Sequence, residues 1–461
     1  GSPDWRGSWW FPRRSNSRDY KTMNEEGTDL PTAIADRLTR PFARILKIKV
    51  ATGVMLFVAT VAALTLSNSK WSVPFLAFWD IRIGLHFGAL DFTRSLRLWI
   101  NEGLMTLFFF VVALELKHSL VLGKLHTLRV AALSFAGALG GMLVPATLYV
   151  ALMNNQLETH SWGTVVATDT AFVIGCLALL GSRIPPSLRL FLLSLAVFDD
   201  VGAILVVAVG YGEPLNWAAL GLAALGLVAT LGATLVGIRS AVVYFLLASV
   251  IWLCLDASGI NPTLAGVALG LMTSTHGWVS DERLRVILER VLAYPRGDHW
   301  SGDTADRRDL QRAGVAVAEV LSPVERLEMA LHPWVGFVIV PLFAFANAGV
   351  TVSGADIGHP VVAAIFVGLV LGKPMGVIGS SWLAVRLGLA TRPPDLSWPL
   401  LAAGGLLAGI GFTMSLFIAG LAYPPVVLDA AKVGILAASV ASAAAGLLML
   451  VGLTSKSPGP G

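Results

Sequence analysis

Charged side chains are scarce in this chain of 461 residues, because Asp, Glu, Lys and Arg together make up 13% of it. Soluble domains contain about twice that share, so a soluble globular protein of this size is excluded. Cysteine is nearly absent, and Cys176 and Cys254 alone cannot build a disulfide-stabilised scaffold. Hydrophobic residues make up 55% of the chain, which excludes an intrinsically disordered protein. A polytopic membrane protein is the class that remains.

Long apolar runs are abundant. Twelve segments of roughly 17–25 residues predict transmembrane helices by length and composition. The chain is therefore predicted to be an all-α polytopic membrane protein with a transmembrane domain at 45–453, and the tails at 1–44 and 454–461 are expected to carry no stable fold. The twelve segments lie at about 45–66, 99–121, 130–152, 164–181, 188–210, 215–237, 241–256, 260–275, 331–351, 360–386, 398–422 and 430–453.

Basic residues are spread unevenly over the loops of this topology. With a cytoplasmic N-terminus, 27 of the 33 Lys and Arg residues fall on the cytoplasmic side. Cytoplasmic loops carry an excess of Lys and Arg, so both termini are predicted to be cytoplasmic. The net charge of +4 then reflects topology and does not indicate a nucleic-acid partner. The first outside loop holds four basic residues, Lys70, Arg82, Arg94 and Arg97.

Two segments between the apolar runs have a pattern of their own. At 79–92, apolar residues alternate with polar residues and glycine, and this period of two predicts an outside β-hairpin; an irregular loop is the alternative. At 276–330 the chain forms a long charged connection on the cytoplasmic side. Its first part, 281–292, predicts an amphipathic helix, and 295–303 is expected to be a mobile insertion.

Two adjacent carboxylates, Asp199 and Asp200, lie at the centre of the apolar run 188–210. A charge at mid-membrane costs about 2.5–3.5 kcal/mol even on lenient scales, so such residues indicate function. Neighbours on a helix point about 100° apart, and the two carboxylates are expected to have different partners. A carboxylate away from water can hold a proton or a small hard cation. The alternative is a pair that only bridges neighbouring helices.

Two further apolar runs also contain polar residues at their centre. Thr168, Asp169 and Thr170 compete for backbone hydrogen bonds, which favours a break in the helix at 164–181; an unbroken helix is the alternative. Thr168 offers oxygen to Na⁺, and Asp169 could offset the positive ends of half-helices. In 360–386, Lys373 precedes a proline, and its expected partner is Asp199 or Asp200. Snorkelling of this lysine to the surface is the alternative.

Glycines at 404–405, 409 and 411 indicate either close packing or a second break, in the segment 398–422. The interrupted segments are the fourth and eleventh of the twelve. Helices 3–5 and 10–12 therefore occupy corresponding positions, which predicts an inverted repeat with a site at mid-membrane. A site that binds either Na⁺ or H⁺ makes the two ions competitors, and alternating access then exchanges one for the other. Nucleotide-binding, zinc-protease and Ser-His-Asp motifs are absent, so we expect a transporter without a cofactor and not an enzyme.

These residues resemble those of the NhaA-type sodium/proton antiporters, and the similarity extends from about residue 45 to 453. The motifs that carry it are Ala-Thr-Asp-Thr-Ala-Phe at 167–172, Leu-Leu-Gly-Ser-Arg at 179–183, Asp-Asp-Val-Gly-Ala at 199–203, His-Pro-Trp at 332–334, Pro-Leu-Phe-Ala-Phe-Ala-Asn at 341–347, Leu-Gly-Lys-Pro at 371–374 and Gly-Ile-Gly-Phe-Thr-Met at 409–414. This family is among the examples on which the inverted-repeat rule rests, so the rule is not independent support.

The resemblance implies twelve helices, with the fourth and eleventh broken and crossing at mid-membrane. It implies electrogenic exchange of cytoplasmic Na⁺ or Li⁺ for external protons, in a bacterial inner membrane. Asp200 becomes the principal ion carboxylate and Asp199 the second acid, able to pair with Lys373, while Thr168 and Asp169 lie at the crossing. The hairpin corresponds to a dimerisation element of the family, so a homodimer surrounded by membrane lipid is expected.

Residues associated with pH activation in this family match only in part. The candidates are Glu115, Lys117, His118 and Glu328. His118 and Ser119 stand where the pattern usually reads Arg-Glu, and Asn261 stands where a histidine is often found. These departures leave the position and steepness of pH activation open. His118 could itself titrate near neutrality, or it could be an ordinary surface histidine.

Two other functions compete with antiport. A sodium-coupled symporter of an organic anion would use the same fold, with Lys373 near the end of a half-helix as the anion site. An intramembrane aspartyl protease would use Asp169 and Asp200, but its Gly-x-Gly-Asp segment is missing, because Phe412 follows Gly411.

Overall fold

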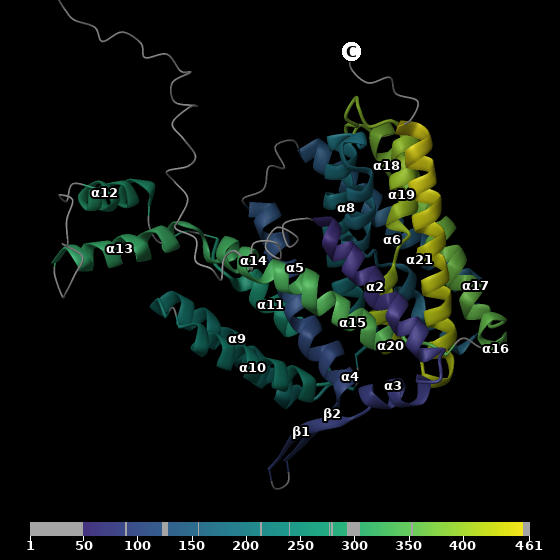
Figure 1. Ribbon diagram of the computed structural model, residues 1–461, viewed down its shortest axis with the longest axis horizontal. Coiled ribbons are helices and arrows are strands. Elements are labelled where there is room, and N and C mark those ends of the chain that lie inside the picture. The colour runs from purple at the N-terminus through teal and green to yellow at the C-terminus, as the bar shows by residue number, and fades with distance from the viewer. Residues whose placement is uncertain are drawn as a thin grey trace, which may run out of the picture. The chain divides into compact units, whose positions relative to one another are not determined.

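The computed structural model of the chain describes residues 49–454, with gaps at 88–89, 122–127, 155, 213, 239, 276, 278–279, 293–304 and 352–353 (Figure 1). The predicted tail at 1–44 lies outside the described residues, and so do 455–461. Within the described part nearly all regular structure is helical, and the strands are β1 (Arg82–Phe87) and β2 (Leu90–Ser95).

The helices fall into two runs along the chain. The first contains α2 (Lys49–Ser67), α3 (Ser72–Trp79), α4 (Leu96–Leu98), the π-helix η3 (Trp99–Leu104), α5 (Met105–Val121), α6 (Leu128–Leu152), the 3-10 helix η4 (Leu157–Val165), α7 (Thr170–Leu180), the 3-10 helix η5 (Gly181–Arg183), α8 (Pro186–Gly210), α9 (Trp217–Val236), α10 (Ala241–Ala257) and α11 (Leu264–Met272). The second contains α12 (Asp281–Leu292), α13 (Ala305–Val320), α14 (Pro323–Trp334), the π-helix η6 (Val335–Ile339), α15 (Val340–Asn347), α16 (Gly354–Ile357), α17 (Pro360–Val367), the π-helix η7 (Gly368–Gly372), α18 (Lys373–Arg386), α19 (Trp398–Ala408), α20 (Phe412–Ala422) and α21 (Pro425–Thr454).

Length and composition support most of the predicted membrane crossings. Eight helices of the described residues are long and apolar enough to span a membrane, and the number rises to ten if two bent pairs each count as one span. The pair α2 and α3 bends by 119°, and the pair α19 and α20 by 45°. Of the twelve predicted segments, α10 and α11 are helical but have only 17 and 9 residues. The prediction of an all-helical polytopic membrane protein is confirmed.

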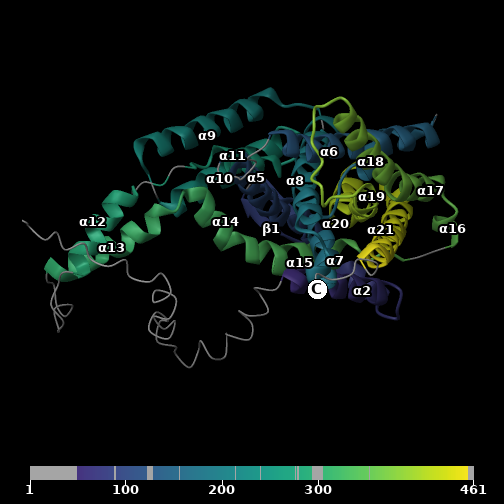
Figure 2. The ribbon, with the colours of Figure 1, turned by 90° about the horizontal axis from the view of Figure 1, so that it is seen from above.

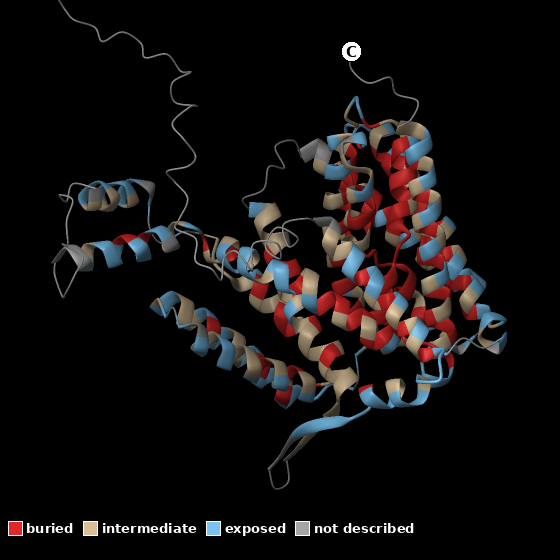
Figure 3. Ribbon diagram, viewed as in Figure 1, coloured by how far each residue is buried: buried red, intermediate tan, exposed pale blue. Residues whose placement is uncertain are grey.

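Helices α6 and α18 cross closely, and this contact places Lys373 in the interior. A Cβ atom on Gly140 would lie 2.3 Å from the carbonyl oxygen of Gly376, and a Cβ on Gly376 would lie 2.0 Å from the carbonyl oxygen of Gly140. Only glycine fits at either position, because backbone atoms cannot move aside. The two helices lie side by side in both views (Figures 1 and 2). Buried residues gather in α8, α19 and α20 (Figure 3).

A π-helical turn precedes the proline that the sequence places beside Lys373. Proline lacks the N–H that would close an α-helical hydrogen bond, and its ring clashes with the preceding turn. The chain accommodates Pro374 by winding η7, residues Gly368–Gly372, as a π-helix directly before α18. The predicted local weakening of this helix therefore takes the form of a wider turn and not of a break.

The hairpin is present, but it begins and ends three residues later than predicted. Strands β1 and β2 pair antiparallel, with Gly84 opposite Thr93, whereas the predicted range is 79–92. The start shifts because α3 continues to Trp79.

The connection at 276–330 contains more helix than predicted. Helix α12 covers the segment that the amphipathic pattern indicates, and α13 follows it. Ser322 and Glu325 form a capping box that starts α14. The expected mobile insertion at 295–303 lies outside the described residues.

Candidate functional site: a pair of crossing broken helices

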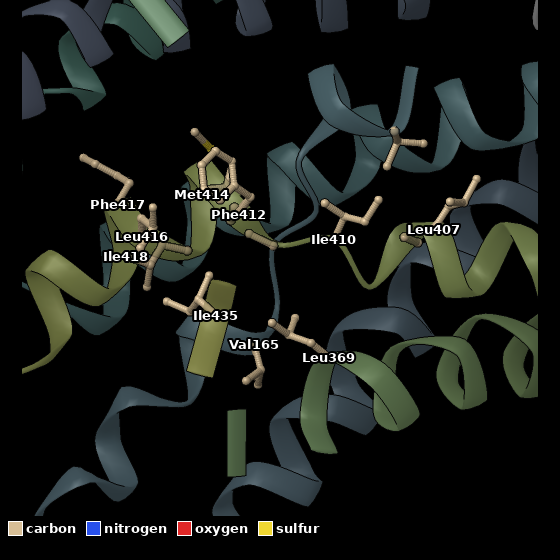
Figure 4. Packing of buried hydrophobic residues seen from close by; sticks show 14 of the residues in the cluster. Val165, Leu369, Leu407, Ile410, Phe412, Met414, Leu416, Phe417, Ile418 and Ile435 are labelled. Carbon is tan, nitrogen blue, oxygen red and sulfur yellow. The ribbon is translucent and has the colours of Figure 1, made fainter. Parts of the chain in front are cut away.

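Two helices are interrupted, and their interruptions meet. Residues 166–169 separate η4 from α7, and residues 409–411 separate α19 from α20. The backbone N–H of Asp169 donates to the carbonyl of Ile410 at 2.6 Å, and Thr168 Oγ1 donates to the carbonyl of Ala408 at 2.8 Å. Figure 4 shows Ile410 on the extended segment between Leu407 and Phe412. Both predicted breaks are confirmed, and the unbroken helix is excluded; in the second segment the break and close glycine packing occur together.

Glycine is required in the second break because the chain passes close to its neighbours there. A Cβ on Gly409 would lie 2.5 Å from the carbonyl oxygen of Leu369, and one on Gly411 would lie 2.2 Å from Ser415 Oγ. Non-helical backbone inside a membrane protein is tolerated where other protein groups satisfy its hydrogen bonds. Here groups of the first break donate hydrogen bonds to backbone carbonyls at the second break.

Asp169 holds the ends of two half-helices. Its Oδ1 accepts the backbone N–H of Phe172 at 2.9 Å, at the start of α7. Its Oδ2 accepts both the N–H and the hydroxyl of Thr413, at 3.0 and 2.6 Å, at the start of α20. A carboxylate at a helix N-terminus offsets the positive end of the helix dipole. One side chain therefore caps both inner half-helices, and both of its oxygens are occupied.

Asp199 pairs with Lys373 in the interior. Lys373 Nζ lies 2.9 Å from Asp199 Oδ2, and neither side chain is exposed to solvent. Lys373 also donates to the carbonyl of Val166 in the first break. Asp199 Oδ2 lies 2.6 Å from Thr168 Oγ1, whose single proton can be donated either to this carboxylate or to the carbonyl of Ala408. Of the two partners that the sequence left open for Lys373, the structure has Asp199, and snorkelling is excluded. Asp199 Oδ1 is buried without a hydrogen-bond partner in the described residues.

Asp200 has a different environment on the next position of α8. The residue is 6% exposed, and Thr170 Oγ1 contacts its Oδ2 at 3.3 Å. Among the described residues no cation lies within ion-pair distance of Asp200. Glu115 on α5 is close enough for its charge to act on Asp200. As expected from the helix geometry, the two adjacent carboxylates meet different partners.

The residues predicted for pH sensing lie in three places. His118 Nδ1 lies 2.7 Å from Glu328 Oε2 on α14. Lys117 Nζ donates to the carbonyls of Leu271 and Thr273 at 2.6 Å each, at the end of α11. Glu115 acts on the interior site through its charge, as described above. Helix α5 thus packs against α8, which carries Asp199 and Asp200, and against α11 and α14.

Two contact residues were not predicted as part of the site. Thr413 binds Asp169, and Thr170 binds Asp200. Each of these hydroxyls lies directly beside a break in a helix. A break leaves backbone and side-chain polar groups without helical hydrogen bonds, so the position next to a break is the signal that could have identified both threonines.

Comparison with known proteins identifies relatives over nearly the whole chain. The Na⁺/H⁺ antiporter 1 family matches residues 43–450. The protein named Na(+)/H(+) antiporter NhaA of Rhizobium meliloti (strain 1021) is 58% identical over 433 residues, which cover 94% of this chain and 99% of that protein. Na(+)/H(+) antiporter NhaA 2 of Acidiphilium cryptum (strain JF-5) is 58% identical over 435 residues, with coverage of 94% and 97%. Na(+)/H(+) antiporter NhaA of Rhodopirellula baltica (strain DSM 10527 / NCIMB 13988 / SH1) is 46% identical over 437 residues, with coverage of 93% and 98%.

Proposed function

Because the chain belongs to the NhaA family of Na⁺/H⁺ antiporters, it is a multi-pass secondary transporter, and we propose that Asp200 and Asp199 form the site at which Na⁺ and H⁺ compete. The observation that supports this assignment is the difference between the two carboxylates. Asp200 has one long hydrogen bond and no cation partner among the described residues, whereas Asp199 is held by Lys373 and Thr168. A bound proton or Na⁺ ion supplies the positive charge that balances the carboxylate of Asp200.

In the proposed cycle, Na⁺ binds to Asp200 and to the unoccupied Oδ1 of Asp199, with the hydroxyl of Thr168 as a third ligand. Oxygen ligands of this kind suit a small hard cation. Bound Na⁺ weakens the attraction between Asp199 and Lys373, since both cations then compete for one carboxylate. Protons bind when Na⁺ leaves. The two carboxylates beside Lys373 can take up more than one proton for each Na⁺ ion that the site binds. The numbers of charges moved in the two directions then differ, and we therefore propose that exchange is electrogenic.

Asp169 has a positioning role in this cycle. It holds the starts of α7 and α20 together at the crossing, and the crossing lies beside the Asp199–Lys373 pair through Thr168 and Val166. A change in the tilt of either half-helix would alter the ligands around the ion. We propose that such a change moves access from one side of the membrane to the other.

The setting of the protein follows from its charges and its relatives. The relatives are bacterial, and the excess of Lys and Arg in alternate loops supports an inner-membrane location with both termini in the cytoplasm. Li⁺ is proposed as a second substrate. A homodimer through β1 and β2 is proposed from the presence of the hairpin, and the pair of His118 and Glu328 is proposed to contribute to pH regulation together with Lys117 and Glu115.

An organic-anion symporter has less support. It would need Lys373 as an anion site, but this lysine is fully buried and already bound to Asp199 and Val166. An anion would have to displace both partners.

Proteoliposomes with an imposed pH gradient and a pH-sensitive dye inside test the proposal. Addition of Na⁺ or Li⁺ should move protons across the membrane, and K⁺ should serve as the inactive cation. The rate should increase when valinomycin and K⁺ clamp the membrane potential, because electrogenic exchange is otherwise limited by the voltage it creates. Absence of proton movement with Na⁺ at every pH from about 6 to 9 would overturn the proposal.

A further inference from the structure

An open apolar cavity of about 430 Å³ lies between α3, η3 and α15, next to the base of the hairpin. It plays no part in the ion site, since none of its residues contacts Asp169, Asp199, Asp200 or Lys373. In a membrane-spanning protein, an open apolar space is filled by lipid and not by water. The wall residues include Phe78, Trp79, Leu96, Trp99, Ile100 and Leu342.

Helix α3, on one side of this cavity, has the character of an interfacial helix. It turns by 119° away from α2, and it exposes Val73 and Phe78, while Trp71 just before it is 67% exposed. Tryptophan and other large apolar side chains are favoured where the hydrocarbon meets the headgroups. A cavity beside a helix of this character is expected to open at the depth where a lipid headgroup and the upper part of its acyl chain lie.

Two buried nitrogen donors at this place lack acceptors. Trp79 forms part of the wall and is 3% exposed, and its Nε1 has no hydrogen-bond partner in the described residues. Arg97 follows the wall residue Leu96, and its Nε is likewise buried and unpartnered there. Buried donors without an acceptor are costly, so they indicate a missing acceptor.

A second basic side chain, Lys432, lies near Arg97, and each of the two has an acidic neighbour. The guanidinium of Arg97 is 3.9 Å from a carboxylate oxygen of Asp80, whose side chain is 69% exposed. Lys432, which is buried, lies close enough for the charge of Arg97 to act on it. Its carboxylate neighbour, Asp429, is 4.0 Å away and half-exposed. Both cations are more buried than the acids near them, so an anion at the cavity would find a favourable potential.

The neighbouring Arg94 differs from Arg97, because its guanidinium has carboxylate and aromatic partners. It binds Glu102 and Asp256, and its guanidinium lies 5.1 Å from the centre of the Phe92 ring and 5.7 Å from that of Trp252. Trp252 in turn stacks on Trp99, a residue of the cavity wall. This cluster fixes one wall, while Arg97 keeps its donor Nε without an acceptor.

We propose that the cavity is a binding site for an anionic phospholipid. One acyl chain lies against Trp99, Ile100 and Leu342, the phosphate binds Arg97 under the influence of Lys432, and Trp79 Nε1 donates to an oxygen of the phosphate or the glycerol ester. Lipid phosphate supplies the counter-charge, and bidentate binding to a phosphate is the geometry that arginine favours.

Native mass spectrometry of the delipidated full chain tests the site by titration with phosphatidylglycerol and with phosphatidylcholine of the same acyl chains. Wild type should bind the anionic lipid more tightly, and Arg97→Gln should lower that affinity by about tenfold, the effect of losing one charged hydrogen bond. Trp79→Phe should weaken both lipids by a smaller factor. Arg82→Gln is the matched control, because it removes the same charge from an exposed position on β1 of the same loop; its affinity should stay at the wild-type value.

A second variant tests the apolar part without changing any charge. Gly103 lines the cavity, and a Cβ there would meet only Trp99, at an ordinary contact of 3.6 Å. Gly103→Leu should fill the space and reduce binding of both lipids, while sodium-proton exchange and elution in gel filtration stay as in wild type.

Several results would overturn the proposal. Equal phosphatidylglycerol affinity in Arg97→Gln and wild type would remove the headgroup site, and equal loss in Arg82→Gln would show only general attraction. Competition by inorganic phosphate at the concentration at which it binds alone would show a small-anion site. Lipid binding that appears only after a dimer dissociates would show that a second copy of the chain covers the cavity.

Discussion

Asp169 and Asp200 are both buried carboxylates, 2% and 6% exposed, yet the protein treats them in opposite ways. Three donors from two half-helices bind Asp169 and occupy both of its oxygens. Asp200 has the single contact from Thr170, at 3.3 Å. A buried charge is tolerated when it is paired or hydrogen-bonded, and otherwise it takes up a proton or a cation. Asp169 is therefore suited to hold the crossing, and Asp200 fits the ion-binding role proposed above.

Asp199 lies between these extremes. One of its oxygens is bound by Lys373 and Thr168, and the other is unpartnered in the described residues. The three aspartates thus form a series from fully satisfied to nearly unsatisfied. Their ability to exchange an ion should increase along the same series, and their contribution to stability should decrease.

The largest effect is expected for Asp200→Asn. An amide cannot take up a proton and carries no charge for Na⁺, so exchange in proteoliposomes should fall by at least about 100-fold, as expected for loss of the principal charged ligand of the ion. The temperature of thermal unfolding in detergent should be unchanged or slightly higher, since a buried charge is removed. Exchange at the wild-type rate would refute the assignment of Asp200 even though the family is certain.

Lys373→Ala should cause the largest loss of stability. Removal of one partner of a buried ion pair leaves the other uncompensated and typically costs about 3–5 kcal/mol. The loss should shrink at low pH, because a proton can then neutralise Asp199. The unfolding temperatures of wild type and Lys373→Ala, compared over a range of pH, measure this loss of stability. The double variant Asp199→Asn with Lys373→Met should recover most of the stability, and failure to recover would show that Lys373 stabilises through Val166 instead.

Asp169→Asn should lower stability by a smaller amount, about 1–3 kcal/mol, the cost of unsatisfied buried donors. Both oxygens of Asp169 accept hydrogen bonds from donors. The NH₂ group of an asparagine would therefore meet a donor in place of an acceptor, and that donor would lose its hydrogen bond. Exchange should become slower while the apparent affinity for Na⁺ stays within a few fold of wild type. Complete loss of exchange at normal stability would instead make Asp169 an ion ligand and remove the contrast with Asp200.

The breaks could be predicted from the sequence because their causes are local. Thr168, Asp169 and the glycines at 409 and 411 disfavour helix wherever they are placed. The residue pattern alone left the partner of Lys373 open, because Asp199 and Asp200 differ only by a rotation about α8, whereas the family resemblance implied Asp199, which the structure has. The close crossing of Gly140 and Gly376 determines where Lys373 enters the interior, and that contact joins residues far apart in the chain.

The pH candidates show the same limit. Glu115, Lys117 and His118 are near neighbours in sequence and were predicted as one group with Glu328. Successive residues of a helix point in different directions, so α5 sends them to different partners. Only the packing of α11 and α14 against α5 decides which partner each one meets.

The smallest effect is expected at His118, where the pairing itself depends on protonation. Histidine ordinarily loses its proton between about pH 5 and 8. The contact of His118 with Glu328 is an ion pair only when the histidine carries a proton. His118→Gln should make the rate of exchange depend less steeply on pH while the maximal rate stays within about twofold, and stability should change by less than about 1 kcal/mol, as for other partly exposed pairs.

The exposed His332 on α14 provides the matched control for this prediction. His332→Gln should leave the pH profile of exchange unchanged, and Glu328→Gln should alter it as His118→Gln does, because either change removes the same pair. Identical profiles for wild type and His118→Gln would make His118 a surface histidine and would move the search for the pH response to Glu115, on α5, which packs against the helix that carries Asp200.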